Sequence, residues 1–405
     1  MPNPPGQNHR VVSGMRPTGQ LHLGNFHGAL ANWVELQYRY ECFFFVADWH
    51  ALTTAYENTE DLKANAHEVL IDWLAAGLNP TACTIFVQSR VPEHAELHLI
   101  LSMVTPVSWL ERVPTYKDQI AQLSDKDLST YGFLGYPLLQ SADILMYRPE
   151  FVPVGEDQVA HVEITREIAR RFNHVFGREP DFEARVASAV KRLGARNGPQ
   201  YDELRRRFQE QGDAEALAKA RAMIAAGSRL TVADRERLLG HLEGGGRSIL
   251  PEPSALLTRT PRVPGLDGRK MSKSYGNTIG LREEPASVEK KLKTMVTDPA
   301  RVRRSDPGDP DKCPVWDLHK IYSEERTQAW VQNGCRTAGI GCLDCKKPLI
   351  ESVLKQLEGF RQRAREYEEN PELVRGIVAE GCERAREAAR ATMAEVREAV
   401  RLEYR

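Results

Sequence analysis

Two short segments contain the side chains best suited to chemistry, and both are typical of sites for phosphate groups. The first, Pro17-Thr-Gly-Gln-Leu-His-Leu-Gly-Asn25, follows a short apolar run and precedes a helical pattern at 26–38. Such a turn presents backbone N–H groups and a helix dipole to an anion, and His22 adds a neutral donor for charge that develops in a transition state. The second, Lys270-Met-Ser-Lys-Ser274, places two ammonium groups three residues apart, between two glycines. We expect this loop to close on a polyphosphate and to follow it as it leaves.

The elements that must position these segments alternate between strands and helices. The apolar run Cys42–Asp48 is typical of a strand buried on both faces of a parallel sheet. Shorter runs at Thr84–Gln88 and Phe151–Val154 alternate with helical patterns that begin after a capping Thr59 and at His161. This rhythm predicts an α/β protein with a Rossmann-like, doubly wound parallel sheet, whose ligands lie at the carboxyl ends of the strands.

Changes in composition divide the chain further. The charged pattern at Tyr201–Ala226 predicts one amphipathic helix, and Thr231 opens a second one with a capping-box pattern. From Glu283 onward the pattern is helical and predicts a bundle distinct from the sheet. We therefore expect the first part of the sheet domain at 1–177, a helical insertion at 178–249, the end of the sheet domain with the lysine loop at 250–284, and a helical domain at 285–405.

Composition excludes several classes of protein. The formal net charge of the 405 residues is −1, so any nucleic-acid contact must come from a local patch. No apolar run approaches the roughly 18 residues that span a bilayer, and the N-terminus lacks the apolar core of a signal peptide. The sequence therefore predicts a cytoplasmic protein with no membrane partner.

Four of the seven cysteines gather late in the chain. Cys313, Cys335, Cys342 and Cys345 have the spacing C-x21-C-x6-C-x2-C. In an intracellular protein such a set indicates a metal site rather than disulfides. The spacing alone does not separate zinc from an iron–sulfur cluster or from unligated thiols, since only one C-x2-C pair is present.

Four segments together resemble a known family. The turn at 17–25, the block Tyr136–Leu145, the block Val152–Gln158 and the loop Lys270–Ser274 occur in the order found in class I aminoacyl-tRNA synthetases. The resemblance is closest to bacterial tryptophanyl-tRNA synthetases and covers about residues 10–177 and 250–405. It implies ATP-dependent activation of L-tryptophan to tryptophanyl-adenylate, with Mg²⁺ bound mainly through phosphate oxygens, and transfer to the 2′-hydroxyl of tRNA(Trp). Members of this subgroup are homodimers, so the resemblance also implies a homodimer.

The resemblance assigns roles to individual residues. It implies His22, Lys270, Lys273 and Lys117 as the catalytic donors and cations. The ATP-binding residues that it implies are Arg16, Pro17, Thr18, Gly24, Asn25, Gly155, Glu156, Asp157, Lys270, Met271, Ser272, Lys273 and Ser274. The tryptophan-binding residues that it implies are Asp143, Tyr136, Gln158, Gln140, Val152, Val154 and His50.

Selectivity is expected to depend on Asp143. An indole N–H is a donor only, and a buried carboxylate makes the stronger, charge-assisted bond with it. The acceptor would be left unpaired by phenylalanine, which is thereby disfavoured. The resemblance places Tyr136 and Gln158 at the α-amino group, Val152 and Val154 beside the rings, and His50 in support.

Other functions fit parts of the sequence. Tyr136, Gln140 and Asp143 also match the Tyr-x-x-x-Gln-x-x-Asp arrangement of tyrosyl-tRNA synthetases. A catalytically silent, synthetase-like RNA-binding protein is a second alternative, but such proteins typically lose the signature histidine or lysines, which are all present here. A small-metabolite nucleotidyltransferase would not explain the helical domain or the cysteine block.

The resemblance also bears on the cysteines. Some tryptophanyl-tRNA synthetases bind a 4Fe–4S cluster through C-x22-C-x6-C-x2-C near the region that reads the anticodon, and the block at 313–345 is similar with a first gap one residue shorter. It implies a 4Fe–4S cluster, with Zn²⁺ as the alternative, in an anticodon-binding domain at 285–405.

Overall fold

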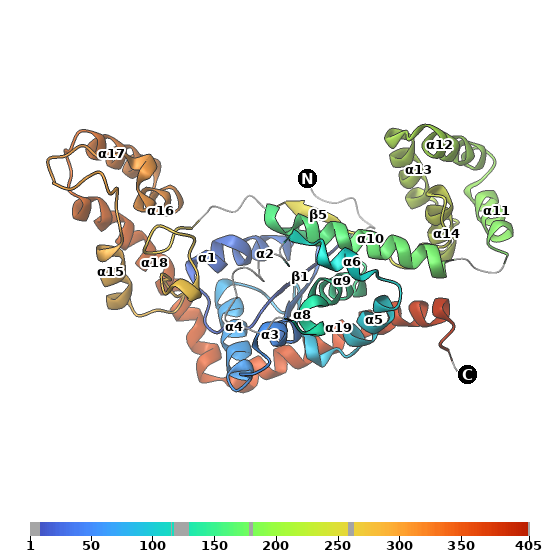
Figure 1. Ribbon diagram of the computed structural model, residues 1–405, viewed down its shortest axis with the longest axis horizontal. Coiled ribbons are helices and arrows are strands. Elements are labelled where there is room, and N and C mark those ends of the chain that lie inside the picture. The colour runs from blue at the N-terminus through green and yellow to red at the C-terminus, as the bar shows by residue number, and fades with distance from the viewer. Residues whose placement is uncertain (1–8, 115, 117–128, 178–180, 258–262, 404–405) are drawn as a thin grey trace.

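The computed structural model describes residues 9–114, 116, 129–177, 181–257 and 263–403. One sheet of five parallel strands has the order β3-β2-β1-β4-β5. The strands are β1 (Arg10–Met15), β2 (Glu41–Val46), β3 (Thr84–Val87), β4 (Phe151–Val154) and β5 (Ser254–Leu257). Helices lie on both sides of the sheet, and the strand order reverses between β1 and β4 (Figure 1). The predicted doubly wound α/β fold is therefore confirmed, with its ligand crevice expected at the ends of β1 and β4.

The helices between the strands of this sheet differ locally from the sequence prediction. The pattern at 26–38 forms a π-helix and then a short α-helix, and the helix expected after Thr59 begins at Leu62, whose N–H bonds to the Thr59 carbonyl. The bounds are α1 (Leu23–Asn25), η1 (Phe26–Leu30, the π-helix), α2 (Ala31–Leu36), α3 (Asp48–Ala55), α4 (Leu62–Ala76), η2 (Gln88–Arg90), α5 (Glu93–Ser102), α6 (Val107–Glu111), α8 (Tyr131–Leu134), α9 (Tyr136–Met146), η3 (Glu156–Gln158) and α10 (Val159–Phe176).

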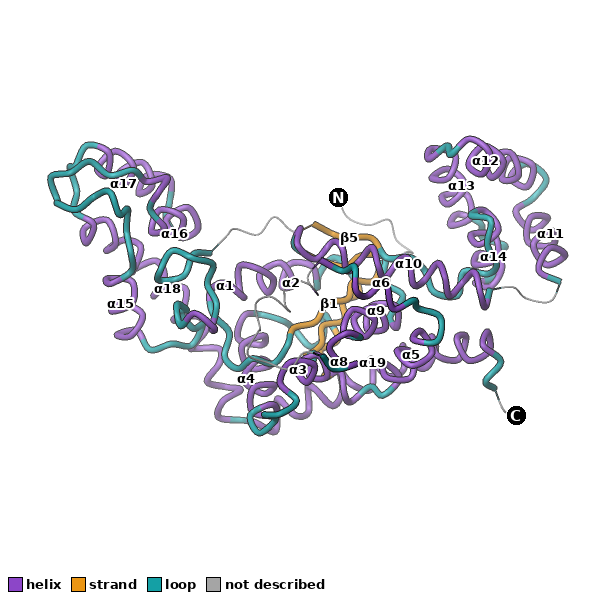
Figure 2. Tube along the Cα trace, viewed as in Figure 1, coloured by secondary structure: helices purple, strands orange, loops and turns teal. Residues whose placement is uncertain are grey.

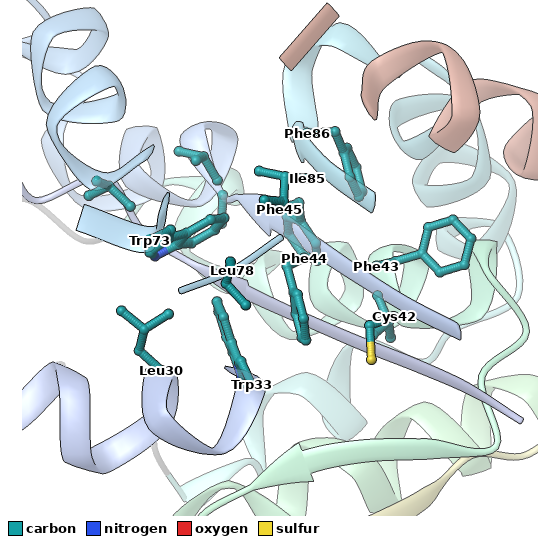
Figure 3. Close-up of a cluster of buried hydrophobic side chains, with 14 of the residues drawn as sticks. Leu30, Trp33, Cys42, Phe43, Phe44, Phe45, Trp73, Leu78, Ile85 and Phe86 are labelled. Carbon is teal, nitrogen blue, oxygen red and sulfur yellow. The ribbon is translucent and has the colours of Figure 1, made fainter. Parts of the chain in front are cut away.

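The apolar run of β2 is buried on both faces, as predicted. Successive side chains of a strand point to opposite faces of the sheet, and Figure 3 shows Phe43 and Phe44 pointing apart. The ring of Phe44 stacks on Trp33 with centroids 4.6 Å apart, and the ring of Phe43 stacks on Tyr147 at the end of α9 at the same separation. This packing fixes α2 on one face and α9 on the other, and both carry residues of the site.

The insertion has a hydrophobic cluster of its own. Its helices are α11 (Phe182–Leu193), α12 (Asn197–Gln211), α13 (Ala214–Ala226) and α14 (Val232–Leu242), and they lie at one end of the molecule (Figure 1). The capping box of Thr231 with Asp234 is confirmed. The prediction of one helix over Tyr201–Ala226 is wrong, because Gly212 adopts a φ of 66° and Asp213 accepts hydrogen bonds from the first N–H groups of α13.

The remaining helices are not all separate from the sheet. They are η4 (Lys273–Tyr275), α15 (Pro285–Thr294), η5 (Pro310–Lys312), α16 (Pro314–Tyr322), α17 (Glu325–Arg336), α18 (Cys342–Glu369) and α19 (Pro371–Val400). Residues of α18 and α19 belong to the same hydrophobic core as the sheet. A Cβ added to Gly381 would lie 1.8 Å from the Ile85 carbonyl oxygen, so the backbones of α19 and β3 are almost in contact. Val315 and Leu318 of α16 also belong to this core, so helices of the predicted separate bundle pack against the sheet domain.

Helices predominate throughout, and the sheet occupies the centre (Figure 2). None of the described helices has the length and apolar composition that a membrane span requires.

Candidate active site

A cavity of about 420 Å³ lies where the strand order reverses. It is lined by residues at the carboxyl ends of β1 and β4 and by helices α3, α9 and the π-helix. The sequence-predicted residues that line it are Arg16, His50, Tyr136, Gln140, Asp143, Val152, Val154, Gly155 and Gln158. The structure thus brings together every residue predicted for the tryptophan pocket, with two of those predicted for ATP.

Asp143 is enclosed by hydrogen-bond donors. Its exposed fraction is 1%, and His50 Nε2 donates to its Oδ2 at 2.8 Å. His94 Nδ1 donates to Oδ1 at 2.6 Å, and Gln88 Nε2 lies 2.7 and 2.9 Å from the two oxygens. On its other side the His94 ring is held by the Tyr147 hydroxyl at 2.7 Å. Gln88 and His94 were missed by sequence reasoning.

These donors keep the Asp143 carboxylate ionised. Burial alone would raise the pKa of Asp143, but the hydrogen bonds from His50 and His94 outweigh burial and lower the pKa from its ordinary value. A carboxylate has about four lone-pair directions, and Gln88 contacts both oxygens, so a donor from a ligand would have to share a lone pair with one of these protein donors.

A second polar chain faces the same cavity. The Tyr136 hydroxyl lies 3.4 Å from His161 Nε2, and His161 Nδ1 lies 2.7 Å from Gln158 Oε1. Because an amide oxygen only accepts, Nδ1 carries the proton, and Nε2 of the neutral ring accepts from Tyr136. Hydroxyl and amide oxygens are acceptors of the kind that an ammonium group requires. His161, which orients both, was also missed.

Apolar side chains complete the cavity. Val152 and Val154 from β4 lie in its wall together with Trp33, Phe45 and Ile144. Planar and branched side chains of this kind favour a flat, apolar ligand group. Gln140 and Gly155 also line the cavity.

His22 is buried at the start of α1, with an exposed fraction of 7%. Burial, and secondly the charge of Lys273, lower the pKa of His22 to about 4, so its ring is neutral at physiological pH. Its Nδ1 accepts from the Asn25 N–H at 3.3 Å, and Asn25 Oδ1 accepts from the His22 N–H at 3.1 Å. The proton of the ring therefore lies on Nε2, which can act as a donor.

The expected row of free backbone N–H groups is only partly present. The Leu23 N–H donates to the Ile279 carbonyl at 3.0 Å, and the Asn25 N–H bonds to His22. The segment after the lysine loop pairs with the turn, since Leu281 N donates to the Leu21 carbonyl at 2.9 Å. The segment at 279–281 therefore holds the turn through backbone hydrogen bonds. Gly24 of the turn also lies against the Met271 side chain of the lysine loop.

The two signature lysines occupy different positions. Lys273 Nζ donates to the Thr18 carbonyl, and burial lowers its pKa. Lys270 is exposed. The turn and the loop therefore meet through Lys273, in a contact that only the tertiary structure establishes.

Asn277 holds the lysine loop in shape. Its Nδ2 donates to Asp267 Oδ1 at 2.7 Å and to the Lys270 carbonyl at 3.2 Å, and its Oδ1 accepts from the Ser272 N–H at 2.8 Å. A Cβ on Gly265 would lie 2.1 Å from the Asn277 amide nitrogen, so only glycine fits beside it. Sequence reasoning did not identify Asn277.

A buried ion cluster anchors the turn from behind. Arg282 Nε donates to Asp72 Oδ1 at 2.6 Å, and its other nitrogens bond to Glu68 and Glu368. Asp72 Oδ2 accepts from the Leu21 N–H at 2.6 Å. One arginine therefore joins α4, α18, the turn and the segment after the lysine loop.

Several residues predicted to bind ATP do not line the amino-acid cavity. Glu156 is exposed, and Pro17 lines a different cavity from Arg16. Ser274 lies within η4. Lys117 and the side chain of Asp157 lie outside the described part of the structure.

The four late cysteines are near one another. Burial, and then the charges of Cys313, Cys335 and Cys342, raise the pKa of Cys345 to about 12. His319 Nε2 lies 3.4 Å from Cys345 Sγ, and Arg301 Nη1 lies 3.9 Å from Cys335 Sγ. Among the described residues, however, no three histidine, cysteine or acidic side chains are arranged to hold one metal ion. The predicted cluster is therefore not confirmed.

Comparison with known proteins places these features in context. The chain matches the family "tRNA synthetases class I (W and Y)" over residues 5–193 and 227–358, so the middle of the insertion lies outside the match. It is 63% identical over 395 residues to a tryptophan–tRNA ligase from Ralstonia nicotianae, covering 98% of this chain and 99% of that protein. A tryptophan–tRNA ligase from Thermotoga maritima is 46% identical and covers 98% of this chain and 100% of its own length. The crystal structure of the Campylobacter jejuni tryptophanyl-tRNA synthetase with ADP and tryptophan is similar with a TM-score of 0.71 at 28% identity, covering 96% of this chain and 99% of that chain.

Proposed function

Because the chain belongs to the class I tRNA synthetases of the tryptophan and tyrosine group, we propose that it is a tryptophan–tRNA ligase. In the first step the tryptophan carboxylate attacks the α-phosphorus of ATP, and the bond to the departing pyrophosphate breaks. In the second step a ribose hydroxyl of the terminal adenosine of tRNA(Trp) attacks the adenylate carbonyl, AMP leaves, and the hydroxyl proton passes to its phosphate. Positioning and charge stabilisation are sufficient for both steps.

The buried, ionised Asp143 is the observation on which the amino-acid specificity depends. His50, His94 and Gln88 already bond to its oxygens, and Gln88 lies within hydrogen-bond distance of both, so an indole N–H would share a lone pair with Gln88. The rings would lie between Val152, Val154 and the aromatic wall. A ligand without an N–H or O–H at this point would lose a charge-assisted bond.

The α-amino group is assigned to Tyr136 and Gln158. Neutral His161 accepts a hydrogen bond from the Tyr136 hydroxyl and donates one to Gln158 Oε1, which orients both oxygens in the cavity that would hold the ammonium group. Gln140 lines the same cavity and completes the predicted set.

Phosphate chemistry is assigned to the turn and the loop. The Nε2–H of neutral His22 is a donor for the charge that grows on the α-phosphate. Lys273, at the turn, and the exposed Lys270 would follow the pyrophosphate, with Lys117 as a third cation. Mg²⁺ enters with ATP and is held chiefly by phosphate oxygens. Because ATP and tRNA are the substrates, we place the protein in the cytoplasm.

We also propose that Cys313, Cys335, Cys342 and Cys345 bind a 4Fe–4S cluster. Two observations support this proposal. The charges of the thiols raise one another's pKa, so the four sulfurs are close together, and nitrogen atoms of Arg301 and His319 lie beside two of the sulfurs. A four-iron cluster separates its thiolate ligands more widely than one Zn²⁺ does, so a loose group of four thiols is suited to the larger unit. When bound, it would hold together the loops around α16–α18.

The cluster has a direct test. Protein purified without oxygen should be brown and contain iron and acid-labile sulfide, and Cys345→Ser should lose both. Colourless protein with one Zn²⁺ per chain would exclude the iron–sulfur cluster.

We propose a homodimer as the assembly. Leu99 on α5, Met103 directly after it and Tyr131 on α8 expose 57%, 72% and 64% of their surface, and exposed apolar groups of this kind are typical of protein interfaces. Light scattering on the purified protein should give twice the mass of the chain, and a single-chain mass would contradict the proposal.

Pyrophosphate exchange with each of the proteinogenic amino acids tests the function. Exchange should be stimulated by tryptophan, and tRNA(Trp) transcripts should become aminoacylated. Stimulation by tyrosine instead would indicate the tyrosyl enzyme, and no exchange with any amino acid would indicate a silent RNA-binding protein.

A further inference from the structure

Tyr147, the residue directly after α9, is joined to the amino-acid cavity by two hydrogen bonds in series. Its hydroxyl lies 2.7 Å from His94 Nε2, and His94 Nδ1 lies 2.6 Å from Asp143 Oδ1. Asp143 lines the cavity, whereas neither His94 nor Tyr147 is among the described residues that do. Both of these side chains are fully buried. The series therefore runs from the cavity into the core, where a ligand does not touch its far end.

The proton positions in this series follow from the ionised state of Asp143. An ionised carboxylate only accepts hydrogen bonds, so His94 Nδ1 carries the ring proton. Nε2 of the neutral ring is then an acceptor, and the Tyr147 hydroxyl is its donor. Burial, and then the charge of Asp143, raise the pKa of Tyr147 above its ordinary value, so the hydroxyl keeps its proton. The hydroxyl thereby holds the His94 proton on the side that faces Asp143.

Aromatic packing leaves His94 Nε2 dependent on this one hydroxyl. The Tyr147 ring stacks on Phe43 of β2 with centroids 4.6 Å apart, which fixes the hydroxyl in place. The His94 ring has its centroid 6.0 Å from those of Phe45 and Phe86. Among the residues that the structure describes, Nε2 has no other hydrogen-bond partner. Loss of the hydroxyl would therefore leave Nε2 buried and unpaired.

His94 in turn affects the charge of Asp143. Burial alone would raise the pKa of Asp143, and the hydrogen bonds from His50 and His94 outweigh burial. If the His94 donor is no longer fixed, the Asp143–His94 pair takes up a proton more easily, on either partner. The carboxyl group is then a weaker acceptor for the N–H of a ligand.

We propose that Tyr147 is a positioning residue for tryptophan recognition, which holds His94 as a donor to Asp143 and so keeps the carboxylate available to the indole N–H. The inference rests on the proposed function, because the indole N–H is the group that tryptophan presents to Asp143. The rings of tryptophan pack against apolar side chains whatever the charge of Asp143. The effect of Tyr147 is therefore confined to ligands that carry an N–H.

A tryptophan analogue in which sulfur replaces the indole N–H tests this confinement. It keeps the ring shape but has no donor. In calorimetric titrations, Tyr147→Phe should raise the Kd for tryptophan about three- to tenfold, which is the effect of one hydrogen bond, and should leave the Kd for the analogue unchanged. The KM for tryptophan in pyrophosphate exchange should rise by the same factor at constant kcat.

Tyr201→Phe is the matched control. Tyr201 is also fully buried, and its hydroxyl donates to the Leu238 carbonyl at 2.7 Å and lies 3.1 Å from His241 Nδ1, within the insertion. This change removes a buried hydroxyl beside a histidine, away from the cavity, so both Kd values should equal those of the wild type. A similar loss of preference for tryptophan in this control would overturn the inference.

A double variant tests whether Tyr147 acts through His94. Asparagine in His94→Asn keeps an N–H near the position of Nδ1 but has no counterpart of Nε2. Adding Tyr147→Phe to His94→Asn should therefore cause no further loss of preference for tryptophan over the analogue, because both changes interrupt the same series. A further loss as large as that of Tyr147→Phe alone would mean that Tyr147 acts by another route, contrary to the inference.

Two further outcomes of the titrations would overturn the inference. Equal weakening of both ligands in Tyr147→Phe would indicate a general change in the shape of the cavity, and an unchanged preference would show that His94 needs no partner. In either case tryptophan-dependent exchange by the wild type would still support the proposed function. Absence of that exchange would instead overturn the proposed function itself.

Discussion

The amino-acid cavity and the lysine loop are held in contrasting ways. Around Asp143, donors from η2, α3 and α5 converge on one carboxylate that is almost completely buried. In the loop, Lys270 is exposed, and Lys273 reaches the turn through a single backbone carbonyl. The position of the Asp143 carboxylate is thus fixed by several hydrogen bonds, whereas the lysine side chains are fixed by few.

This difference matches what each region must do. Recognition of a side chain requires donors and acceptors that are already in place, because a group that moves to meet the ligand loses affinity and selectivity. A cation that follows a departing pyrophosphate must instead be able to move. The fixed point of the loop is Asn277, which leaves the lysine side chains free to reorient while it holds their backbone.

The largest effect is expected at the rigid region. Asp143→Asn replaces one of the two acceptor oxygens with a donor –NH₂ group. At least one of the donors His50, His94 and Gln88 then loses its hydrogen-bond partner. We expect kcat/KM for tryptophan in pyrophosphate exchange to fall about 100-fold, from the lost charge-assisted bond and the stranded donors. Asp317→Asn, at an exposed aspartate on α16, is the control. An unchanged preference for tryptophan would contradict the role of Asp143.

The next effect tests the mobile region. Lys273→Ala should lower kcat for exchange about 100-fold or somewhat less, since it removes one charge from the developing pyrophosphate. The KM for tryptophan should stay the same, in contrast to Asp143→Asn. Lys219→Ala, at an exposed ion pair of the insertion, should change neither constant. A rise in the KM for tryptophan with no change in kcat would mean that Lys273 acts in tryptophan binding and not on the pyrophosphate.

A smaller effect is expected where the loop is fixed. Asn277→Ala removes the three hydrogen bonds that shape the loop, and we expect kcat for exchange to fall about tenfold as the lysines lose their position. The free energy of unfolding, measured by thermal unfolding, should fall by about 1–3 kcal/mol, because a buried polar network is broken. Full activity in Asn277→Ala would show that the loop acquires its shape from ATP.

The smallest effect concerns pH. The pKa of His22 is lowered to about 4, so its donor is neutral throughout the range from pH 5.5 to 7.5. A positively charged donor with the ordinary pKa of roughly 6.5 would instead become more effective as the pH falls through that value. The ratio of exchange rates between wild type and His22→Gln should therefore be constant from pH 5.5 to 7.5. A ratio that rises toward low pH would contradict the neutral donor.

Sequence reasoning was most successful where one segment contains the whole signal. The buried β2 follows from an unbroken apolar run, and the capping box at Thr231 follows from residues three positions apart. The break between α12 and α13 was also encoded locally, by Gly212 and Asp213, but the charged helical pattern on both sides concealed it.

The site was less accessible to the same reasoning. His94 lies in α5, which has no clear polar face, and His161 lies in the amphipathic α10, and nothing local relates them to Asp143 or Tyr136. Gln88 follows a strand without any distinctive motif. The contacts of Gln88 and His94 with Asp143, and of His161 with Tyr136, join separate elements of the chain.

The sequence by itself determined the alternation of strands and helices in the first half of the chain, the two signature segments and the residue types of the pocket, because these depend on local pattern and on resemblance. The tertiary structure decided which donors surround Asp143, which lysine touches the turn and how α19 joins the sheet. The reason is that hydrogen bonds and close packing depend on distances between side chains from separate elements, and only the folded chain fixes those distances.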